Sequence, residues 1–341
     1  MQVYICANLM LFIIAWYDYK LSRGLRLLID TLSILLLTFI FGLRTEVGAD
    51  WLEYLRLFEL YKIDANIFNH IEFSFKFINI FSQYFSLGYQ GVILISTLLF
   101  VIFTIVGCRK LGINPYLFLG IIFPYYFVMS GMNYIRQSLG LSIFIIYLGY
   151  ILENKKNQSW IALLLGMSFH KSVLIFSFLS LIDVKKRYLV FFGIPLSLLG
   201  LSFIVTSYSD LYISSSHYDS AGFLLRYLYV IISALFIFIN RHEFSCHLKR
   251  LIAFSIVGSF FIGGLSFLTS TGADRLAYYF IVLNTILILL LSRNRLMNRF
   301  NCNFAICTCF AVSQLVFFVW STWGSIVDYY MFNHLIFDDI F

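Results

Sequence analysis

The sequence predicts an all-α protein that crosses a membrane many times, and two observations lead to this prediction. Of its 341 residues, 61% are hydrophobic and 12% are charged, and the mean hydropathy is +0.87. A water-soluble fold could not bury so much apolar surface, so lipid must be the solvent. Most of the 24 Lys and Arg residues fall into six short clusters between long apolar runs, as the positive-inside rule predicts for cytoplasmic loops. We expect one integral membrane domain over residues 1–341.

About ten apolar runs are long enough to cross a bilayer. Strong Leu, Ile and Phe runs and only three prolines favour helices over barrel strands. If the N-terminus lies outside, ten crossings place both termini outside and all six basic clusters inside. The expected spans are 3–17, 27–43, 89–107, 113–130, 134–152, 188–207, 223–240, 251–270, 277–292 and 303–321.

The apolar run 158–182 needs a different structure because basic clusters flank it on both sides. A single crossing would place the second cluster outside, and 25 residues are too few for two spans of about 20 residues each. We therefore expect a re-entrant hairpin or two short tilted helices, with His170 near the tip. Such a break must face protein or a wet cavity.

The largest outside segment, residues 44–88, mixes charged side chains with many aromatic ones. This mixture predicts amphipathic helices that lie on the membrane surface. The net charge of +7 follows mostly from the cytoplasmic clusters beside anionic lipid, so no nucleic-acid partner is expected. The six cysteines map to the cytoplasmic side or to apolar spans, and we expect neither disulfides nor a bound metal.

Three arginines at the outer ends of different spans, Arg44, Arg136 and Arg275, oppose the orientation rule. Positive charge near a membrane is costly, so these side chains need a compensating interaction. One interpretation is that their guanidinium groups converge on a phosphate or pyrophosphate, which they can bind with two hydrogen bonds each. The alternative is that each arginine extends to lipid headgroups or pairs with a neighbour such as Glu46 or Asp274.

Asp50 and His170 are the candidate proton acceptors. Asp50 either caps the helix that follows it or hydrogen-bonds to a sugar hydroxyl, with Trp51 and Tyr54 as stacking surfaces. His170 and Lys171 interrupt an apolar run, where such a pair is costly unless it has a function.

Lesser candidates are Glu72, His70, Arg226 and Asp30, although Asp30 is better explained as a partner of Arg26 at i, i+4. The sequence contains no phosphate-binding loop, dinucleotide fingerprint, zinc-binding histidine motif or GxSxG elbow, so no cofactor is expected. The energy for any reaction must therefore come from the substrate or from a gradient.

Four segments together resemble the O-antigen and exopolysaccharide polymerases of the Wzy and EpsG group. They are FGLRTEVGADWLEYLRLF (41–58), MNYIRQSLGLSIFIIYLGY (132–150), FHKS (169–172) and DRLAYYF (274–280). The resemblance implies an inner-membrane glycosyltransferase that joins undecaprenyl-diphosphate-linked repeat units at the periplasmic face, with both termini periplasmic.

The resemblance also implies roles for individual residues. It assigns Arg44, Arg136 and Arg275 to the pyrophosphate and Asp50 and His170 to catalysis, without deciding which of the two is the general base. Trp51, Tyr54, Glu72 and Tyr278 are expected to contact the sugar or acceptor. The implied partners are a lipid-linked oligosaccharide donor and acceptor and the membrane lipid, and a role for a chain-length regulator is left open.

Two other functions compete with this interpretation. A flippase or transporter for lipid-linked oligosaccharides could also hold a pyrophosphate with arginines, but its charges should follow a cavity open to both sides. An O-antigen ligase usually has a large outer loop late in the chain, whereas here the largest outer segment follows the second span.

Overall fold

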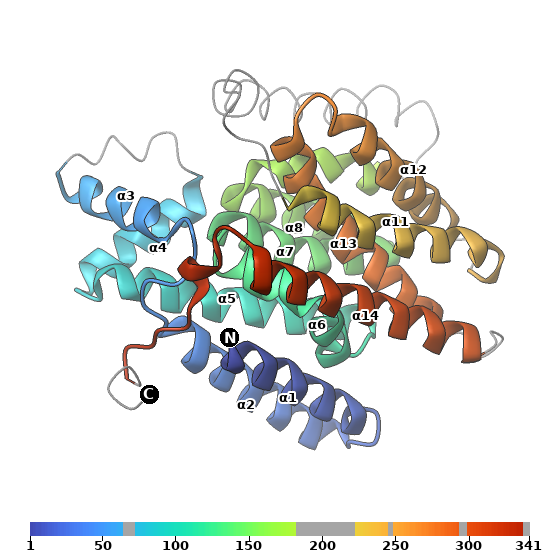
Figure 1. Cartoon of the computed structure of the whole chain (residues 1–341), viewed down its shortest axis with the longest axis horizontal. Coiled ribbons are helices and arrows are strands. Elements are labelled where there is room, and N and C mark those ends of the chain that lie inside the picture. The colour runs from blue at the N-terminus through green and yellow to red at the C-terminus, as the bar shows by residue number, and fades with distance from the viewer. Residues whose placement is uncertain (64–71, 182–221, 245–247, 293–298, 337–341) are drawn as a thin grey trace.

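The computed structural model describes residues 1–63, 72–181, 222–244, 248–292 and 299–336. These residues form a bundle of helices, with the shorter α3 (Trp51–Ile63) and α4 (Phe73–Tyr84) at one edge (Figure 1). Within the described ranges the only strand-like pairing is an isolated bridge between Arg44 and His334. The prediction of an all-α fold is confirmed for this part of the chain.

The remaining helices follow one another through short connections. They are α1 (Gln2–Asp18), α2 (Arg23–Gly42), α5 (Gly88–Leu111), α6 (Pro115–Phe123), α7 (Ile135–Leu152), α8 (Lys156–Phe169), α11 (Phe223–Ile239), α12 (Lys249–Leu265), α13 (Ser270–Ser292) and α14 (Arg299–Trp323). One segment is a π-helix, η2 (Pro124–Gly131). Three others are 3-10 helices: η3 (Lys171–Leu181), η5 (Arg241–Glu243) and η7 (Val327–Tyr330).

Proline sets both ends of α6. The Asn114 side chain accepts hydrogen bonds from the backbone N–H groups of Tyr116 and Leu117, and Pro115 occupies the first turn, where no N–H is needed. Pro124 cannot donate the next helical bond, and the chain continues from there as the wider π-helix η2.

The helices support a protein that passes through a membrane several times. Five of them, α2, α5, α7, α13 and α14, contain stretches that are long and apolar enough to cross a bilayer, and α1, α6 with η2, and α11 are shorter apolar helices. Every expected span coincides with a helix except 188–207, which lies outside the described residues. Ten full crossings therefore remain a prediction.

The helices α7 and α13 form the centre of the bundle, because both are apolar around most of their circumference and are largely buried. In contrast, α2 buries a narrow face and exposes a row of leucines, as expected for a helix that borders lipid.

The described part of the run 158–182, up to residue 181, forms a helical hairpin. The helix α8 ends at Phe169, His170 takes an extended backbone conformation, and η3 runs back alongside α8. The Ser159 and Ser180 hydroxyl oxygens, near the two ends of the hairpin, lie 3.4 Å apart. The predicted break near His170 is confirmed within the residues that the structure describes.

Both described ends of the chain lie at the same end of the bundle, here named the outer end (Figure 1). The Tyr4 hydroxyl donates to the carbonyl oxygen of Tyr330 at 2.8 Å. The N–H of Thr45 donates to the carbonyl of Asn333 at 3.1 Å, and the N–H of Gly48 donates to the carbonyl of Tyr329 at 2.7 Å. This arrangement agrees with an even number of crossings, whereas the side of the membrane on which the ends lie remains a prediction.

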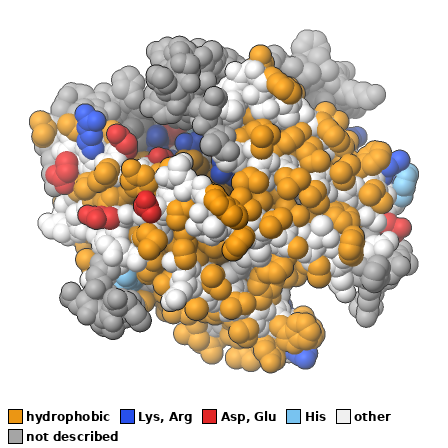
Figure 2. Space-filling view, in the orientation of Figure 1, with side chains coloured by type: hydrophobic (Ala, Val, Ile, Leu, Met, Phe, Trp, Pro, Cys, Tyr) orange, Lys and Arg blue, Asp and Glu red, His pale blue; other side chains and the backbone are white. Residues whose placement is uncertain are grey.

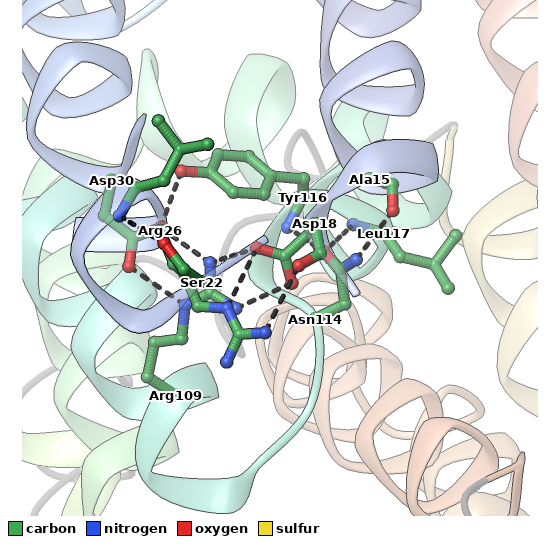
Figure 3. Close-up of polar contacts among 10 residues, drawn as sticks. Ala15, Asp18, Ser22, Arg26, Asp30, Arg109, Asn114, Tyr116 and Leu117 are labelled. Atoms are coloured by element: carbon green, nitrogen blue, oxygen red, sulfur yellow. Dashed lines mark hydrogen bonds and ion pairs between the residues drawn. The ribbon is translucent and has the colours of Figure 1, made fainter. Parts of the chain in front are cut away.

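A buried ion-pair cluster ties α1, α2 and α5 together at the opposite, inner end (Figure 3). Arg109 donates to Asp18 at 2.8 and 2.5 Å and to Asp30 at 3.0 and 2.7 Å. The Tyr116 hydroxyl donates to Asp30 at 2.7 Å. The predicted pairing of Asp30 with Arg26 is wrong: Arg26 lies beside Asp18, because Arg109 reaches both carboxylates from the neighbouring helix.

We predict that Arg109→Ala destabilises the protein by about 3–5 kcal/mol, because it leaves Asp30 without its cation and Asp18 with only the more distant Arg26. The adjacent Lys110→Ala is the matched control, since it also removes one inner charge but breaks a more exposed pair with Glu153, at a cost of about 1 kcal/mol or less. Thermal unfolding in detergent measures both. Equal losses from the two variants would contradict a stabilising role for the cluster.

Candidate functional site

The loop after α2 is anchored by Arg44, which is almost completely buried with 1% of its surface exposed. Its guanidinium donates to the carbonyl oxygens of Phe41 at 2.6 Å and Met132 at 3.2 Å, and to the Thr97 hydroxyl at 3.2 Å. All these partners are neutral protein oxygens. The structure therefore places Arg44 as an anchor between α2, α5 and the start of α7, apart from the other two outer arginines.

Asp50 is held in place by the same contact between the loop and the residues before α7. Its backbone N–H donates to the Asn133 side-chain oxygen at 2.7 Å, and its carbonyl accepts the first helical bond of α3 from Tyr54. Gly48 has a φ of 116°, and a Cβ built on it would lie 2.7 Å from the carbonyl oxygen of Met132. Only glycine fits this close approach.

Arg136, in the first turn of α7, pairs with Glu72. Its Nη1 lies 2.8 Å from Glu72 Oε2, and the Glu72 side chain is 3% exposed while that of Arg136 is 22% exposed. The Arg136 guanidinium also lies 5.8 Å from the centre of the Tyr54 ring. Arg136 thus connects α7 to α3 and to the residue that precedes α4.

Arg275, in the second turn of α13, lies over the ring of Tyr134 with 3.3 Å between the guanidinium carbon and the ring centre. Gln137 fixes this residue, because its amide donates to the Arg275 carbonyl at 2.7 Å. The neighbouring Asp274 forms a bidentate pair with Arg226 at 2.5 and 2.8 Å. Asp274 is therefore the ion-pair partner of Arg226, a residue that was only a lesser candidate from the sequence.

His170 at the tip of the hairpin also approaches this region. Its Nδ1 lies 2.5 Å from the Ser172 hydroxyl oxygen, and the same oxygen lies 2.7 Å from the Tyr279 hydroxyl of α13. The charges that act on His170 come from Glu72, Arg136, Arg275 and Lys171. The break in the hairpin therefore brings the imidazole to the group around Arg136.

Electrostatic coupling connects Asp50 to both outer arginines. Burial raises the pKa of Asp50 above its ordinary value, and Arg275 and Arg136 oppose that rise. Burial alone would also raise the pKa of Glu72, but opposing interactions, of which the charge of Arg136 is the largest, outweigh it and hold the pKa below its ordinary value. We name the outer cluster as Asp50, Glu72, Arg136, His170 and Arg275.

The candidate aromatic residues are mostly packed into the protein. Trp51 contacts Tyr89 with ring centres 5.0 Å apart, Tyr54 contacts Phe75 at 5.6 Å, and Tyr278 contacts Tyr134 at 5.9 Å. Trp51 and Tyr54 are 8% exposed, and Tyr278 is 1% exposed. Their packing fixes the walls of the outer cluster, and a sugar-contacting role for them stays a prediction.

Figure 2 shows basic and acidic side chains grouped in a hollow on the side of α3 and α4, on a face that is otherwise largely hydrophobic. Within the described ranges, no group of three His, Cys, Asp or Glu side chains could hold a metal ion. His70 and the span 188–207 lie outside the described residues.

Sequence reasoning missed the residues that position the cluster, namely Asn133, Gln137, Ser172 and Tyr279. All four are polar groups within quoted segments or next to candidate residues, but their partners are 83 or more residues away for Asn133, Gln137 and Tyr279. Only Ser172, two residues after His170, could have been inferred from local sequence.

A profile of the EpsG family matches residues 27–334, which include every member of the outer cluster. No curated protein and no solved structure matches the chain.

We predict that Gly48→Ala costs about 1–3 kcal/mol more than Gly88→Ala, because a Cβ on Gly48 meets the Met132 carbonyl oxygen in addition to the backbone strain. Gly88 is the matched control: it also has a positive φ, of 65°, but a Cβ there has no neighbour within 4 Å. The thermal unfolding temperatures of the two variants measure this difference in stability. Indistinguishable values would show that the loop can move away from Met132.

The ion pair of Glu72 and Arg136 predicts a stability difference that depends on pH. A carboxyl with a lowered pKa stabilises the fold above its unfolded pKa, near 4.5, and this stabilisation is lost as pH falls through the lower folded value. Glu72→Gln should therefore lower stability by about 1.5–3 kcal/mol at neutral pH, and the difference should shrink below pH 4.5. A difference that does not change with pH would rule out the ion pair as its cause.

Proposed function

Because this chain belongs to the EpsG family, we propose that it is a polysaccharide polymerase of the O-antigen or a related surface-glycan type. In this proposal it transfers a growing glycan from one undecaprenyl diphosphate to the nonreducing end of another lipid-linked repeat unit. The reaction takes place at the periplasmic face of the inner membrane, where we place the outer end of the bundle. The apolar helices and the family membership agree with a multi-pass membrane enzyme.

The observation that supports this proposal most is the grouping of Arg136 and Arg275 around Asp50 at the outer end. Two guanidinium groups from different helices beside a carboxylate and an imidazole suit a substrate that combines a diphosphate with sugar hydroxyls. Arg44 does not take part directly in this proposal, because it is almost completely buried and both of its terminal nitrogens, Nη1 and Nη2, donate to Phe41, Thr97 and Met132. It holds the loop that carries Asp50.

The chemistry requires one proton transfer and one stabilised leaving group. A hydroxyl oxygen of the acceptor attacks the anomeric carbon of the donor, the bond from that carbon to the diphosphate oxygen breaks, and a general base takes the hydroxyl proton. The departing lipid diphosphate gains negative charge, and arginines already in position stabilise this charge more in the transition state than in the ground state. Inversion at the anomeric carbon follows from a single displacement.

Asp50 is suited to the role of base. Its raised pKa strengthens it as a proton acceptor, and the two arginines oppose that rise and so favour its ionised form. His170 is the other candidate. Cleavage of the bond between the glycan and the diphosphate supplies the driving force, so the mechanism needs neither a nucleotide nor ATP.

The experiment that tests this function uses a strain from which the gene has been deleted and then restored. A polymerase is required for long glycan chains, so its loss should leave surface lipid carrying a single repeat unit. Loss of a ligase would leave polymer on undecaprenyl diphosphate, and loss of a flippase would leave single units on the cytoplasmic side. Either of these two results would overturn the proposal.

We predict that Arg136→Ala and Arg275→Ala each reduce polymer formation by about 100-fold or more, in line with the loss of one preorganised donor at a developing anion. Arg136→Lys should recover only part of the activity, because an ammonium cannot form the planar two-bond contact. Arg241→Ala, which removes an exposed charge near the inner end, is the control. Normal chain-length ladders from both outer variants, at normal protein levels, would exclude the arginines from the reaction.

A further inference from the structure

The imidazole of His170 is held through one ring nitrogen, Nδ1. The backbone N–H of Ser172 lies 3.3 Å from Nδ1 and donates to it, and the Ser172 hydroxyl oxygen lies 2.5 Å from the same atom. A backbone N–H can only donate, so Nδ1 must present its lone pair. The neutral ring therefore carries its proton on Nε2.

A second helix reinforces this arrangement. The Tyr279 hydroxyl lies 2.7 Å from the Ser172 hydroxyl, which fits a chain in which Tyr279 donates to Ser172 and Ser172 donates to His170. Both residues are buried. The Tyr279 ring is fixed against Phe144 and Phe176, with ring centres 5.4 and 4.7 Å apart. The tautomer of His170, which the Ser172 backbone N–H requires, is thus further stabilised by a side chain of α13.

The hairpin can reach this position because α7 has a glycine at the contact. A Cβ on Gly140 would lie 3.0 Å from the Val173 side chain, 3.2 Å from the His170 Cβ and 3.6 Å from the Tyr279 hydroxyl. The absence of a side chain at residue 140 lets the turn at His170 pack directly on α7.

The other nitrogen, Nε2, is the ring atom left for a substrate. His170 is partly exposed, and among the described residues no group hydrogen-bonds to Nε2. The positive charges of Arg136, Arg275 and Lys171 act on the ring, and Glu72 is the acidic residue that acts on it. A neutral donor is suited to this setting, because an imidazolium would add a further positive charge beside three cations.

We propose that Ser172 and Tyr279 are positioning residues that hold His170 as a neutral Nε2–H donor to a diphosphate oxygen of the lipid-linked substrate. This inference rests on the proposed function. No proton is transferred at His170: it contributes a hydrogen bond to the departing diphosphate, beside Arg136 and Arg275. The role of general base then falls to Asp50.

The tautomer can be measured directly, whatever reaction the protein performs. The full chain, labelled with ¹⁵N-histidine in lipid nanodiscs, is compared with His170→Asn to assign the signal among the six histidines. We expect the Nε2–H tautomer at neutral pH, with the Nδ1–H form increasing in Ser172→Ala and Tyr279→Phe. An Nδ1–H or doubly protonated ring in the unaltered protein would overturn the proposal.

Matched controls lie in the same hairpin and in the helix packed against it. Ser177→Ala in η3 removes a buried hydroxyl that has no hydrogen-bond partner among the described residues. Tyr147→Phe in α7 removes a hydroxyl that donates to the Phe176 carbonyl of η3 at 2.7 Å, nearer the inner end. Both variants should leave the His170 signal unchanged. A shift as large as that in Ser172→Ala would show that any disturbance of the hairpin alters the ring.

Activity separates a donor from a base. The amide of His170→Gln can donate from about the place of Nε2, so we expect polymer formation within about tenfold of the unaltered protein, whereas His170→Asn should lose about 100-fold, as when a donor is removed from an oxyanion site. Equal, large losses in both folded variants would indicate a base and overturn the donor role. If the unaltered protein forms no polymer, the proposed function fails, and the NMR result still decides the tautomer.

Discussion

Ionised side chains inside an apolar bundle are the constraint on which the rest of this structure depends. Each buried arginine needs a partner, because an uncompensated charge in this environment is very costly. Arg109 receives two carboxylates from α1 and α2, Arg226 receives Asp274, and Arg136 receives Glu72. These pairs connect helices that are distant in the sequence, so the arginines determine which helices lie together at each end.

The hydrogen-bond and ion-pair partners of each arginine distinguish the arginines that stabilise the fold from those that we propose to bind the substrate. Arg109 and Arg226 form two or more charged hydrogen bonds and are bound firmly within the bundle. Arg44 is surrounded by carbonyl and hydroxyl oxygens and acts through the loop that it holds. Arg136 and Arg275 lie partly exposed, each beside an aromatic ring and each acting on Asp50. Their shared action on Asp50 at the outer end is what distinguishes these two.

The sequence was sufficient to predict the helices and turns that are determined by residues close to one another in the chain. Apolar runs predicted the helices, and the conflict between two basic clusters predicted the hairpin that turns at His170. It could not predict pairing, because several carboxylates are chemically equivalent partners for each arginine. Asp30 was assigned to Arg26 from i, i+4 spacing, yet Arg109 of a later helix binds it. Arg44 looked the same as Arg136 and Arg275 in the sequence, and only three-dimensional packing shows that it is enclosed.

The hairpin explains why a site can form at the outer end. A break in the backbone at membrane depth is stable only where protein or water satisfies its polar groups. Here the His170 ring accepts from the Ser172 N–H, the His170 N–H donates to the Gly166 carbonyl, and the His170 carbonyl accepts from the Val173 N–H. The hydroxyl oxygens of Ser74 in α4 and Ser168 in α8 lie 2.6 Å apart, so the end of α8 next to the turn is also joined to α4. Asp50, Glu72, Arg136, His170 and Arg275 thus come from five separate segments whose positions are mutually fixed. Groups fixed before the substrate arrives need little reorganisation as charge develops, which is the condition under which a few hydrogen bonds can lower a barrier appreciably.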